Sequence, residues 1–217
     1  MKILLLTNKR HKVALEAIKF LKKKKINFKC IDTKIQNRIK ISGKFDYLFS
    51  FLNPLFINRD VRKKIKKNSI NIHPGPPEYP GYGCYNFALL DGAKSYGCTT
   101  HQINDKIDNG KIIEVKRFKL KYDNINLEKL IKITHKNCLF LFKKIINKII
   151  KNGYIKIEKN EKWKRKAYTK IQFEKARKIN LNDTEKNISK KIKAFSYKNF
   201  ACIYFKIKGK KYEIKEK

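Results

Sequence analysis

Acidic residues, long apolar runs and cofactor fingerprints are scarce or missing in this sequence. Only 18 of the 217 residues are Asp or Glu, against 55 Lys and Arg, which leaves a formal net charge of +37. The first apolar run, Ile3–Leu6, is far too short for a signal peptide or a membrane span, so we expect a soluble, cytoplasmic protein without a membrane partner. No G-x-G-x-x-G follows that run, which argues against a dinucleotide at the usual first turn.

Cysteines in the pairs that bind metals or form disulfides are also missing. The five cysteines are an odd number and show no C-x-x-C spacing. They are typical of reduced, mostly buried thiols in a cytosolic protein, and not of a zinc site or a disulfide framework. These residues are Cys30, Cys84, Cys98, Cys138 and Cys202. We therefore expect no metal.

The positive charge is carried by lysine, since only seven of the 55 basic residues are arginine. Lys-rich faces gain affinity for nucleic acid by displacing counterions from phosphate. Specific readers of bases and phosphates rely on the forked guanidinium of Arg, however, and the lysines here are spread along the whole chain with abundant Asn and Ile. An A/T-biased coding sequence produces this composition. We therefore favour a protein without a nucleic-acid partner and keep a basic RNA-binding protein as an alternative.

Short apolar runs alternate with helically spaced segments in the first third of the chain. Predicted strands are Ile3–Thr7, Phe28–Ile31, Tyr47–Leu52 and Ser69–His73, and predicted helices are Val13–Leu21 and Arg59–Ile65. Strands that alternate with helices are joined by right-handed crossovers, which makes neighbouring strands parallel. The predicted fold class is α/β, with a Rossmann-like, mostly parallel sheet that carries helices on both faces.

The remaining chain continues this pattern and then changes character. After a Pro- and Gly-rich loop come a helix, two strands and a long amphipathic helix, predicted over Cys84–Lys94, Cys98–Ile103, Ile112–Phe118 and Leu127–Ile150. Trp163–Ile179 is basic and irregular, Asp183–Phe195 predicts a capped helix, and Ala201–Ile207 with Lys211–Ile214 predicts a hairpin around Gly209. We predict a main domain over residues 1–150 and a small appendage of helix plus β-hairpin, a candidate dimerisation element, over residues 151–217.

Asn71, His73 and Asp108 form the strongest candidate for a chemical site. Residues i and i+2 of a strand point to the same face, so Asn71 and His73 project together from the carboxyl end of a strand, where ligands bind in open α/β sheets. An Asn amide is a good donor to a developing oxyanion, and a His takes or relays a proton. Asp108, in an Asp-Asn-Gly turn, could orient the imidazole or hold a relay water. This combination suits an acyl-type transfer to an external nucleophile.

The charge distribution supports this site, although each motif alone has a simpler interpretation. No Lys or Arg falls between Ser69 and Ala93, while about one residue in four is basic in the chain as a whole. An Asn-x-His-Pro at a strand end is more often a turn and cap arrangement, and Asp-Asn-Gly is usually a hairpin turn. The combination, and neither motif by itself, predicts a function.

Two segments resemble the formyltransferases that use 10-formyltetrahydrofolate: Asn71–Gly81 (NIHPGPPEYPG) and Gly97–Ile113 (GCTTHQINDKIDNGKII). That family has a strand ending Asn-x-His-Pro, a Pro-x-Tyr-x-Gly loop, a Gly-x-Thr strand and an Asp-x-Gly turn. Asn71, His73 and Asp108 match its catalytic residues, and its substrate loop is matched by Pro77, Tyr79 and Gly81. The sequence departs from the family at Gly75, where Ser is common, and in a loop that is one residue shorter, with Pro-Pro in place of Leu-Leu.

The resemblance implies a mechanism that agrees with the residue types. An acceptor amine attacks the formyl carbon of the folate, Asn71 and His73 hold the oxyanion, and protons pass between the amine, His73 and Asp108. The domain of residues 1–150 is then the catalytic one, and the cosubstrate is 10-formyltetrahydrofolate, with no metal. By the same resemblance, the folate lies against Phe51, Leu52, Asn53 and Pro54 on one side and Asn104, Asp105 and Ile107 on the other.

The C-terminal appendage of residues 151–217, from here on called the tail, narrows the choice of acceptor. Lys193-Ala194-Phe195, followed by strands around a Gly, is similar to the tails of enzymes that formylate nucleotide-linked amino sugars or initiator methionyl-tRNA. The tRNA enzymes are much longer, so the resemblance implies a sugar N-formyltransferase that acts on the primary amine of a nucleotide-linked amino sugar. The hairpin of the tail hints at a homodimer but does not establish one. The alternatives are a methionyl-tRNA formyltransferase-like enzyme, a formyltetrahydrofolate hydrolase and a basic RNA-binding protein.

Overall fold

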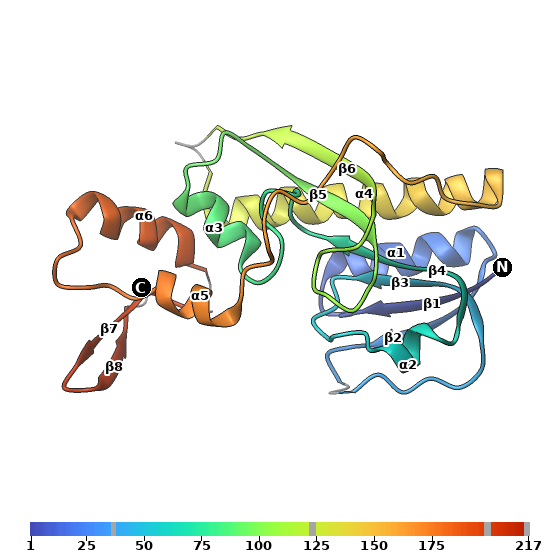
Figure 1. Ribbon diagram of the computed structural model, residues 1–217, viewed down its shortest axis with the longest axis horizontal. Coiled ribbons are helices and arrows are strands. Elements are labelled where there is room, and N and C mark those ends of the chain that lie inside the picture. Colours follow the sequence, from blue (N-terminus) through green and yellow to red (C-terminus); the bar gives the residue numbers. More distant parts are fainter. Residues whose placement is uncertain (36–37, 122–124, 198–200, 215–217) are drawn as a thin grey trace.

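The computed structural model describes residues 1–35, 38–121, 125–197 and 201–214 (Figure 1). Its main sheet has six strands in the order β2-β1-β3-β4-β5-β6. These strands are β1 (Lys2–Thr7), β2 (Asn27–Asp32), β3 (Phe45–Phe51), β4 (Ile65–His73), β5 (Ser95–Gln102) and β6 (Ile112–Lys119). The first four are parallel to one another, whereas β5 is antiparallel to β4 and β6 is antiparallel to β5. The predicted mostly parallel α/β sheet is therefore confirmed.

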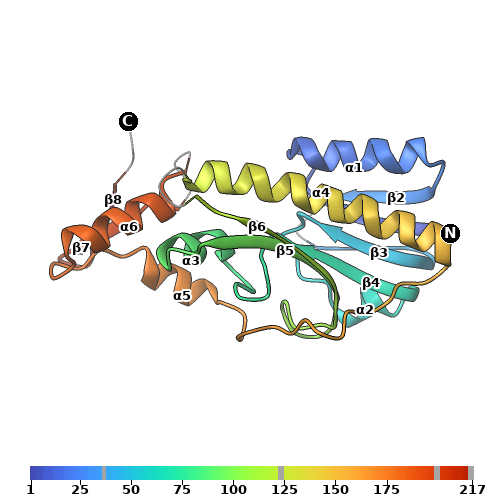
Figure 2. The same ribbon diagram turned by 90° about the horizontal axis from the view of Figure 1, so that it is seen from above.

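Helices cover one face of this sheet, and a short helix with its adjoining loops covers the other (Figure 2). The first face carries α1 (Lys12–Lys23) and α4 (Leu127–Asn152), whose apolar side chains form one core cluster with Ile3 and Leu5 of β1. Leu4 and Leu6 point the other way, into a second cluster that includes Val61 of α2 (Arg59–Arg62). The alternation along β1 thus separates two apolar layers, as the two-residue period of a strand requires.

The long helix α4 begins and ends at clear sequence signals. The Asn126 side chain accepts a hydrogen bond from the Lys129 amide at 2.9 Å, and Gly153 takes the left-handed conformation with a φ of +76° at the other end. An Asn at the N-cap and a Gly just beyond the last turn are the preferred residues at these two positions. The helix predicted over Leu127–Ile150 is confirmed and extends two residues further, to Asn152.

The C-terminal elements gather at one end of the molecule, around a third apolar cluster (Figure 1). They are α5 (Lys170–Ala176), α6 (Glu185–Phe195), β7 (Tyr204–Ile207) and β8 (Lys210–Glu213), with α3 (Cys84–Leu90) beside them. Phe173 of α5 and Phe195 of α6 pack in the same cluster as Phe87 of α3 and Leu130 of α4. The appendage therefore shares its core with the main sheet domain, and the division at residue 150 stays a prediction.

Several predicted boundaries were wrong, and strand pairing explains one of them. The segment predicted as helix over Arg59–Ile65 is helical only to Arg62, because Ile65 already pairs with Phe45 as the start of β4. The helix predicted to Lys94 ends at Leu90. The stretch predicted as irregular contains α5, which a capping box of Thr169 and Gln172 starts. No helix in the described ranges is long and apolar enough to cross a membrane.

Candidate active site

Asn71 and His73 lie at the carboxyl end of β4, in the middle of the sheet. Asn71 is flanked by Ser50 of β3 on one side and His101 of β5 on the other. The His73 ring is 4% exposed, and its Nδ1 lies 3.0 Å from the Asp108 carboxylate. The two side chains therefore meet the same carboxylate, as their i, i+2 spacing predicted.

Asp108 is the group on which the contacts of the site converge. Its Oδ2 accepts from the Gly81 amide at 2.8 Å and faces His73 Nδ1, while its Oδ1 accepts from Asn71 Nδ2 at 3.3 Å and faces His101 Nε2 at 3.1 Å. The residue has a φ of +42°, a left-handed conformation that Asp tolerates better than most residues. Asp108 is 8% exposed, so nearly all of its bonding capacity is used inside the protein.

His101 is a member of the site to which sequence reasoning gave no role. Its Nε2 lies 3.1 Å from Asp108 and 3.1 Å from Asn71 Nδ2, while its Nδ1 lies 2.8 Å from the Gln102 carbonyl. The available signal was its place in the Gly97–Ile113 segment, two residues after Thr99. What the sequence could not supply was the antiparallel register that sets His101 beside Asn71.

Burial and charge pull the titrating groups of the site in opposite directions. Burial lowers the pKa of His73 below its ordinary value, although the Asp108 carboxylate and the Tyr79 carbonyl act to raise it. Burial alone would raise the pKa of Asp108, but His73, His101 and the Gly81 amide together hold it well below its usual range. The carboxylate is therefore ionised and the imidazole of His73 is neutral at neutral pH.

Both ring nitrogens of His73 face hydrogen-bond acceptors. Its Nε2 lies 2.9 Å from the Tyr79 carbonyl, and its Nδ1 faces Asp108. A neutral imidazole carries one N–H and donates to only one of these partners, whereas the imidazolium donates to both. His73 thus gains a second hydrogen bond when it takes up a proton, and this gain suits the role of a general base.

The loop of residues 74–83 approaches His73 closely through its backbone. Tyr79 contributes its carbonyl, Gly81 its amide to Asp108, and Pro77 its carbonyl to the Lys164 amide at 3.0 Å. A Cβ added to Gly75 would lie 2.5 Å from His73 Nε2 and 2.8 Å from the Tyr79 carbonyl oxygen. Glycine at position 75 is thus the residue that lets ring and loop meet.

A second unpredicted feature covers the site from the C-terminal side. Residues 153–169, here called the strap, run from the end of α4 across the loop to α5. Trp163 of the strap lies edge-on to His101, with ring centroids 5.0 Å apart, and to His73 at 6.0 Å. Its indole N–H donates to the Gly110 carbonyl at 2.8 Å. Sequence reasoning placed Trp163 in an irregular basic stretch, because nothing local marks a contact made over 53 positions.

The residues expected to hold folate flank Asn71 and His73 on both sides. Phe51 is buried and pairs with Ile72, and Leu52 beyond it has a φ of +51°. The Asn53 amide donates to Ser50 Oγ at 3.3 Å and to the Leu55 carbonyl at 2.9 Å, which fixes the turn at Pro54.

The other expected folate segment lies in the connection between β5 and β6. The Asn104 side chain accepts from the Lys106 amide at 2.9 Å, Asp105 pairs with Arg62 of α2, and Ile107 is 59% exposed. Because β4 lies between β3 and β5, this segment and Phe51–Pro54 border the same strand end. No group of three His, Cys, Asp or Glu side chains that could hold a metal ion occurs among the residues described.

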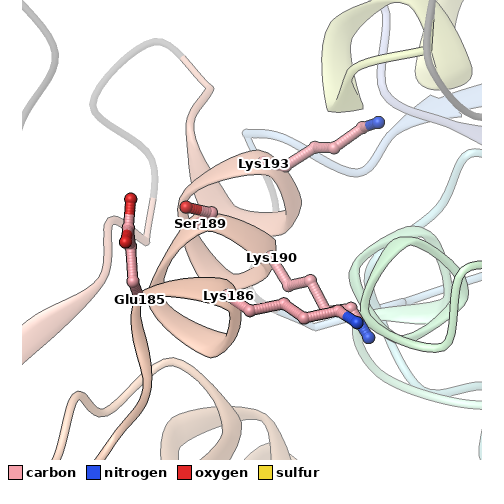
Figure 3. A pocket seen from close by; sticks show the side chains of 5 residues that line it. All are labelled: Glu185, Lys186, Ser189, Lys190 and Lys193. Atoms are coloured by element: carbon pink, nitrogen blue, oxygen red, sulfur yellow. The ribbon is translucent and has the colours of Figure 1, made fainter.

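A lysine-lined hollow of about 500 Å³ lies away from these residues, on α6 (Figure 3). Its lining comprises Glu185, Lys186, Ser189, Lys190 and Lys193. In Figure 3, Lys186 and Lys190 extend in the same direction from the helix, away from Glu185. The hollow therefore offers two neighbouring ammonium groups on the tail and none of the proton-transfer residues described above.

Comparison with known proteins assigns the part of the chain that carries this site. The family model described as formyl transferase matches residues 45–139, a range that includes Asn71, His73, His101 and Asp108. Residues 45–139 are thus similar to the formyl transferase family. The ArnA bifunctional polymyxin resistance protein of Wigglesworthia glossinidia brevipalpis is 26% identical to this chain over 152 residues, 70% of this chain and 23% of the relative. The chain spans less than a quarter of the length of the curated relatives that it matches.

Solved structures extend the likeness beyond the formyl transferase match. A sugar N-formyltransferase from Shewanella sp FDAARGOS_354 superposes with a TM-score of 0.80 and 18% identity, over 100% of this chain and 97% of that one. An N-formyltransferase from Helicobacter canadensis, in complex with folinic acid and dTDP-3-aminofucose, gives a TM-score of 0.74 and 19% identity, over 96% and 84%. At these identities the likeness shows the fold, which includes the tail as well as the formyl transferase region.

Proposed function

We propose that this protein transfers the formyl group of 10-formyltetrahydrofolate to the primary amine of a nucleotide-linked amino sugar. The observation that carries the proposal is the convergence of Asn71, His73 and His101 on Asp108, at the carboxyl end of β4 in a formyl transferase region. An amide donor, a neutral imidazole and an ionised carboxylate are what acyl transfer to an external amine requires.

In the proposed reaction the amine nitrogen attacks the formyl carbon, and the carbonyl oxygen becomes an oxyanion. The Asn71 amide stabilises that oxyanion, while His73 takes the proton that the attacking amine releases. The bond between the formyl carbon and N10 of the folate then breaks, and a proton returns to N10. The products are the N-formyl sugar and tetrahydrofolate. Asp108 stabilises the imidazolium of His73 between the two proton transfers.

The place of the folate is supported by the arrangement of the strand ends. Phe51–Pro54 and the connection of residues 103–111 border β4 from either side, so a folate whose pterin ring lies between them would bring the formyl group on its N10 to Asn71. The Helicobacter canadensis protein, which shares this fold, binds folinic acid. We propose Phe51, Leu52, Asn53, Pro54, Asn104, Asp105 and Ile107 as the folate-contacting set, and Pro77, Tyr79 and Gly81 as the acceptor side.

The acceptor class is supported by the extent of the structural likeness. The chain matches a sugar N-formyltransferase over 97% of that protein, tail included. A tRNA acceptor is the second candidate, because Lys186 and Lys190 extend together from α6 and would suit a polyphosphate backbone. We further propose a cytoplasmic homodimer, since the hairpin of β7 and β8 exposes Ile207 and Tyr212 at 55% and 40%.

The deciding experiment supplies 10-formyltetrahydrofolate alone, with dTDP-3-aminofucose, or with methionyl-tRNA, and measures tetrahydrofolate and N-formyl product. Sugar-dependent release of tetrahydrofolate supports the proposal. Release without any acceptor would point to a hydrolase, and no release under any condition would point to a binding protein. Lys186→Gln with Lys190→Gln is the matched control, because it lowers the charge of α6 and leaves the catalytic cluster intact.

Salt dependence separates the two acceptors further. A nucleotide sugar carries two phosphates, so its apparent affinity should fall only modestly between about 50 and 200 mM salt. A tRNA engages many phosphates, and its binding would fall by orders of magnitude over the same range. A steep salt slope together with inhibition by tRNA at 150 mM salt, where the Debye length is about 8 Å, would overturn the sugar assignment.

A further inference from the structure

Trp163 is held against the catalytic cluster more firmly than its position in a connecting segment requires. The strap that carries it is bonded to both walls of the site. On one side, the Lys164 and Tyr168 amides donate to the carbonyls of Pro77 and Pro80, at 3.0 and 2.9 Å. On the other, the Glu158 amide donates to the Ile112 carbonyl at 2.9 Å. The backbone on either side of Trp163 is therefore fixed to the loop of residues 74–83 and to β6.

Ion pairs fasten the same segment from outside. Arg117 of β6 pairs with Glu161 of the strap and with Glu78 of the loop at 3.0 Å. One guanidinium thus joins three parts of the chain, and Glu161 lies two residues before Trp163. Arg is suited to such a junction, because its rigid fork presents several donors at once.

The indole itself is oriented by the turn that carries the catalytic carboxylate. Its N–H donates to the Gly110 carbonyl, two residues from Asp108, and its ring meets the imidazoles of His101 and His73 edge to face. Such aromatic contacts favour one ring orientation over others. His73, His101 and Asp108 are 4%, 2% and 8% exposed, low values for three polar groups at a site that must receive two substrates.

Water competes with the acceptor amine for the formyl carbon in the reaction proposed above. An amine that attacks the formyl carbon gives an N-formyl product and tetrahydrofolate, whereas a water molecule gives formate, a proton and tetrahydrofolate. The groups that assist the amine, namely an oxyanion donor and a general base, would assist water equally well. Selectivity for the amine therefore depends on what covers these groups, since closing a site against water suppresses hydrolysis of its reactive substrate.

We propose that Trp163 is a positioning residue that keeps the His73 and His101 imidazoles oriented about Asp108 and excludes water from the side of the site that it covers. This inference rests on the proposed formyl transfer and adds a determinant of its specificity for amine over water. The strap, contributed by the C-terminal third of the chain, thereby completes a site whose reacting groups all come from residues 71–108.

The test compares Trp163→Ala and Trp163→Phe with the wild type, using 10-formyltetrahydrofolate and dTDP-3-aminofucose and measuring formate and N-formyl sugar in the same reaction. We expect the ratio of formate to N-formyl sugar to rise about tenfold in Trp163→Ala, with a lower kcat for the sugar and little change in its KM. Trp163→Phe keeps a ring over the imidazoles and loses the bond to Gly110, so its ratio should lie between the two. Tyr154→Ala is the matched control, because Tyr154 belongs to the strap but is 64% exposed.

The outcomes separate this inference from the function on which it rests. A wild type that forms no N-formyl product with any amino sugar overturns the proposed function, and this inference with it. An active wild type whose ratio is unchanged in both Trp163 variants overturns the inference alone. If Trp163→Ala fails to fold, Trp163→Phe still decides the matter, because a structural role would lower its yield or melting temperature without moving the ratio.

The wild-type protein provides an independent check. Trp163 is the one tryptophan of the chain, so its fluorescence reports on this position without labelling. Folinic acid that enters the site should change the Trp163 emission, with a midpoint equal to the Kd measured by calorimetry. Binding seen by calorimetry with unchanged emission would place the indole away from the occupied site and overturn the inference.

Discussion

Replacing Asp108 by Asn tests the cluster at the group where its contacts meet. An amide presents one acceptor and one donor in place of two acceptors. If its NH₂ faces the Gly81 amide, that hydrogen bond is lost and His73 must offer an unprotonated Nδ1. If the new NH₂ group instead takes the place of Asp108 Oδ1, the Asn71 side chain must turn so that its oxygen, and no longer its NH₂ group, faces residue 108. Either orientation reverses a group that the proposed reaction uses.

The expected magnitudes follow from these contacts. One lost hydrogen bond at the partly buried Gly81 amide should lower the free energy of unfolding by about 1–3 kcal/mol. A general base held in the wrong tautomer should lower turnover by about 10²–10⁴-fold. Because His73 and Asp108 act as a unit, the double variant Asp108→Asn with His73→Gln should cost little more than the worse single variant.

The assay is the initial rate of tetrahydrofolate release with saturating donor and acceptor, at equal concentrations of folded protein. Circular dichroism and thermal unfolding of each variant establish that the folded fraction is comparable. Two results would refute the reasoning. Near-normal turnover in Asp108→Asn would mean that the carboxylate is only structural, and defects that multiply in the double variant would mean that the two residues act independently.

Three further predictions concern the surroundings of the cluster. Asn71→Ala should lower turnover by about 10²–10³-fold with little loss of folate binding, measured by calorimetry, since it removes one oxyanion donor. Gly75→Ser should lower both the melting temperature and turnover, because its Cβ would lie 2.5 Å from His73 Nε2; wild-type values for both would show that the loop yields easily. Burial lowers the pKa of the half-buried His135 to about 4, and the neighbouring His11 acts in the same direction. As the pH drops, this residue therefore takes up a proton in the unfolded chain before it does so in the folded one. The free energy of unfolding should fall by up to about 3 kcal/mol between pH 6.5 and pH 4. His135→Gln should make that loss shallower in urea titrations across this pH range, and an unchanged slope would count against a neutral His135.

Local patterns accounted for the parallel half of the fold. Apolar runs such as Ile3–Thr7 and the capped, amphipathic Leu127–Ile150 carry their own signals of type and boundary, and both lie where they were predicted. Ile65 was misplaced because helical spacing and strand pairing compete for it, and the pairing with Phe45 is not visible in the sequence.

The site was predictable where its residues share an element and not where tertiary contacts assemble it. Asn71 and His73 come together through strand periodicity alone. His101 joins them through the register between β4 and β5, and Trp163 joins through a strap that crosses from the far end of α4. Neither contact leaves a local pattern, so only the folded chain reveals them.

The helix α4 has a thermodynamic consequence for the whole chain. Its 26 residues span about 39 Å at 1.5 Å per residue. Leu130, near its start, belongs to the core beneath the tail, and Phe142 and Ile146, further along, belong to the core against the sheet. Because α4 contributes side chains to both cores, unfolding either core would expose apolar side chains at one end of this helix. We therefore expect both cores to unfold in one cooperative transition, with no separate transition for residues 151–217.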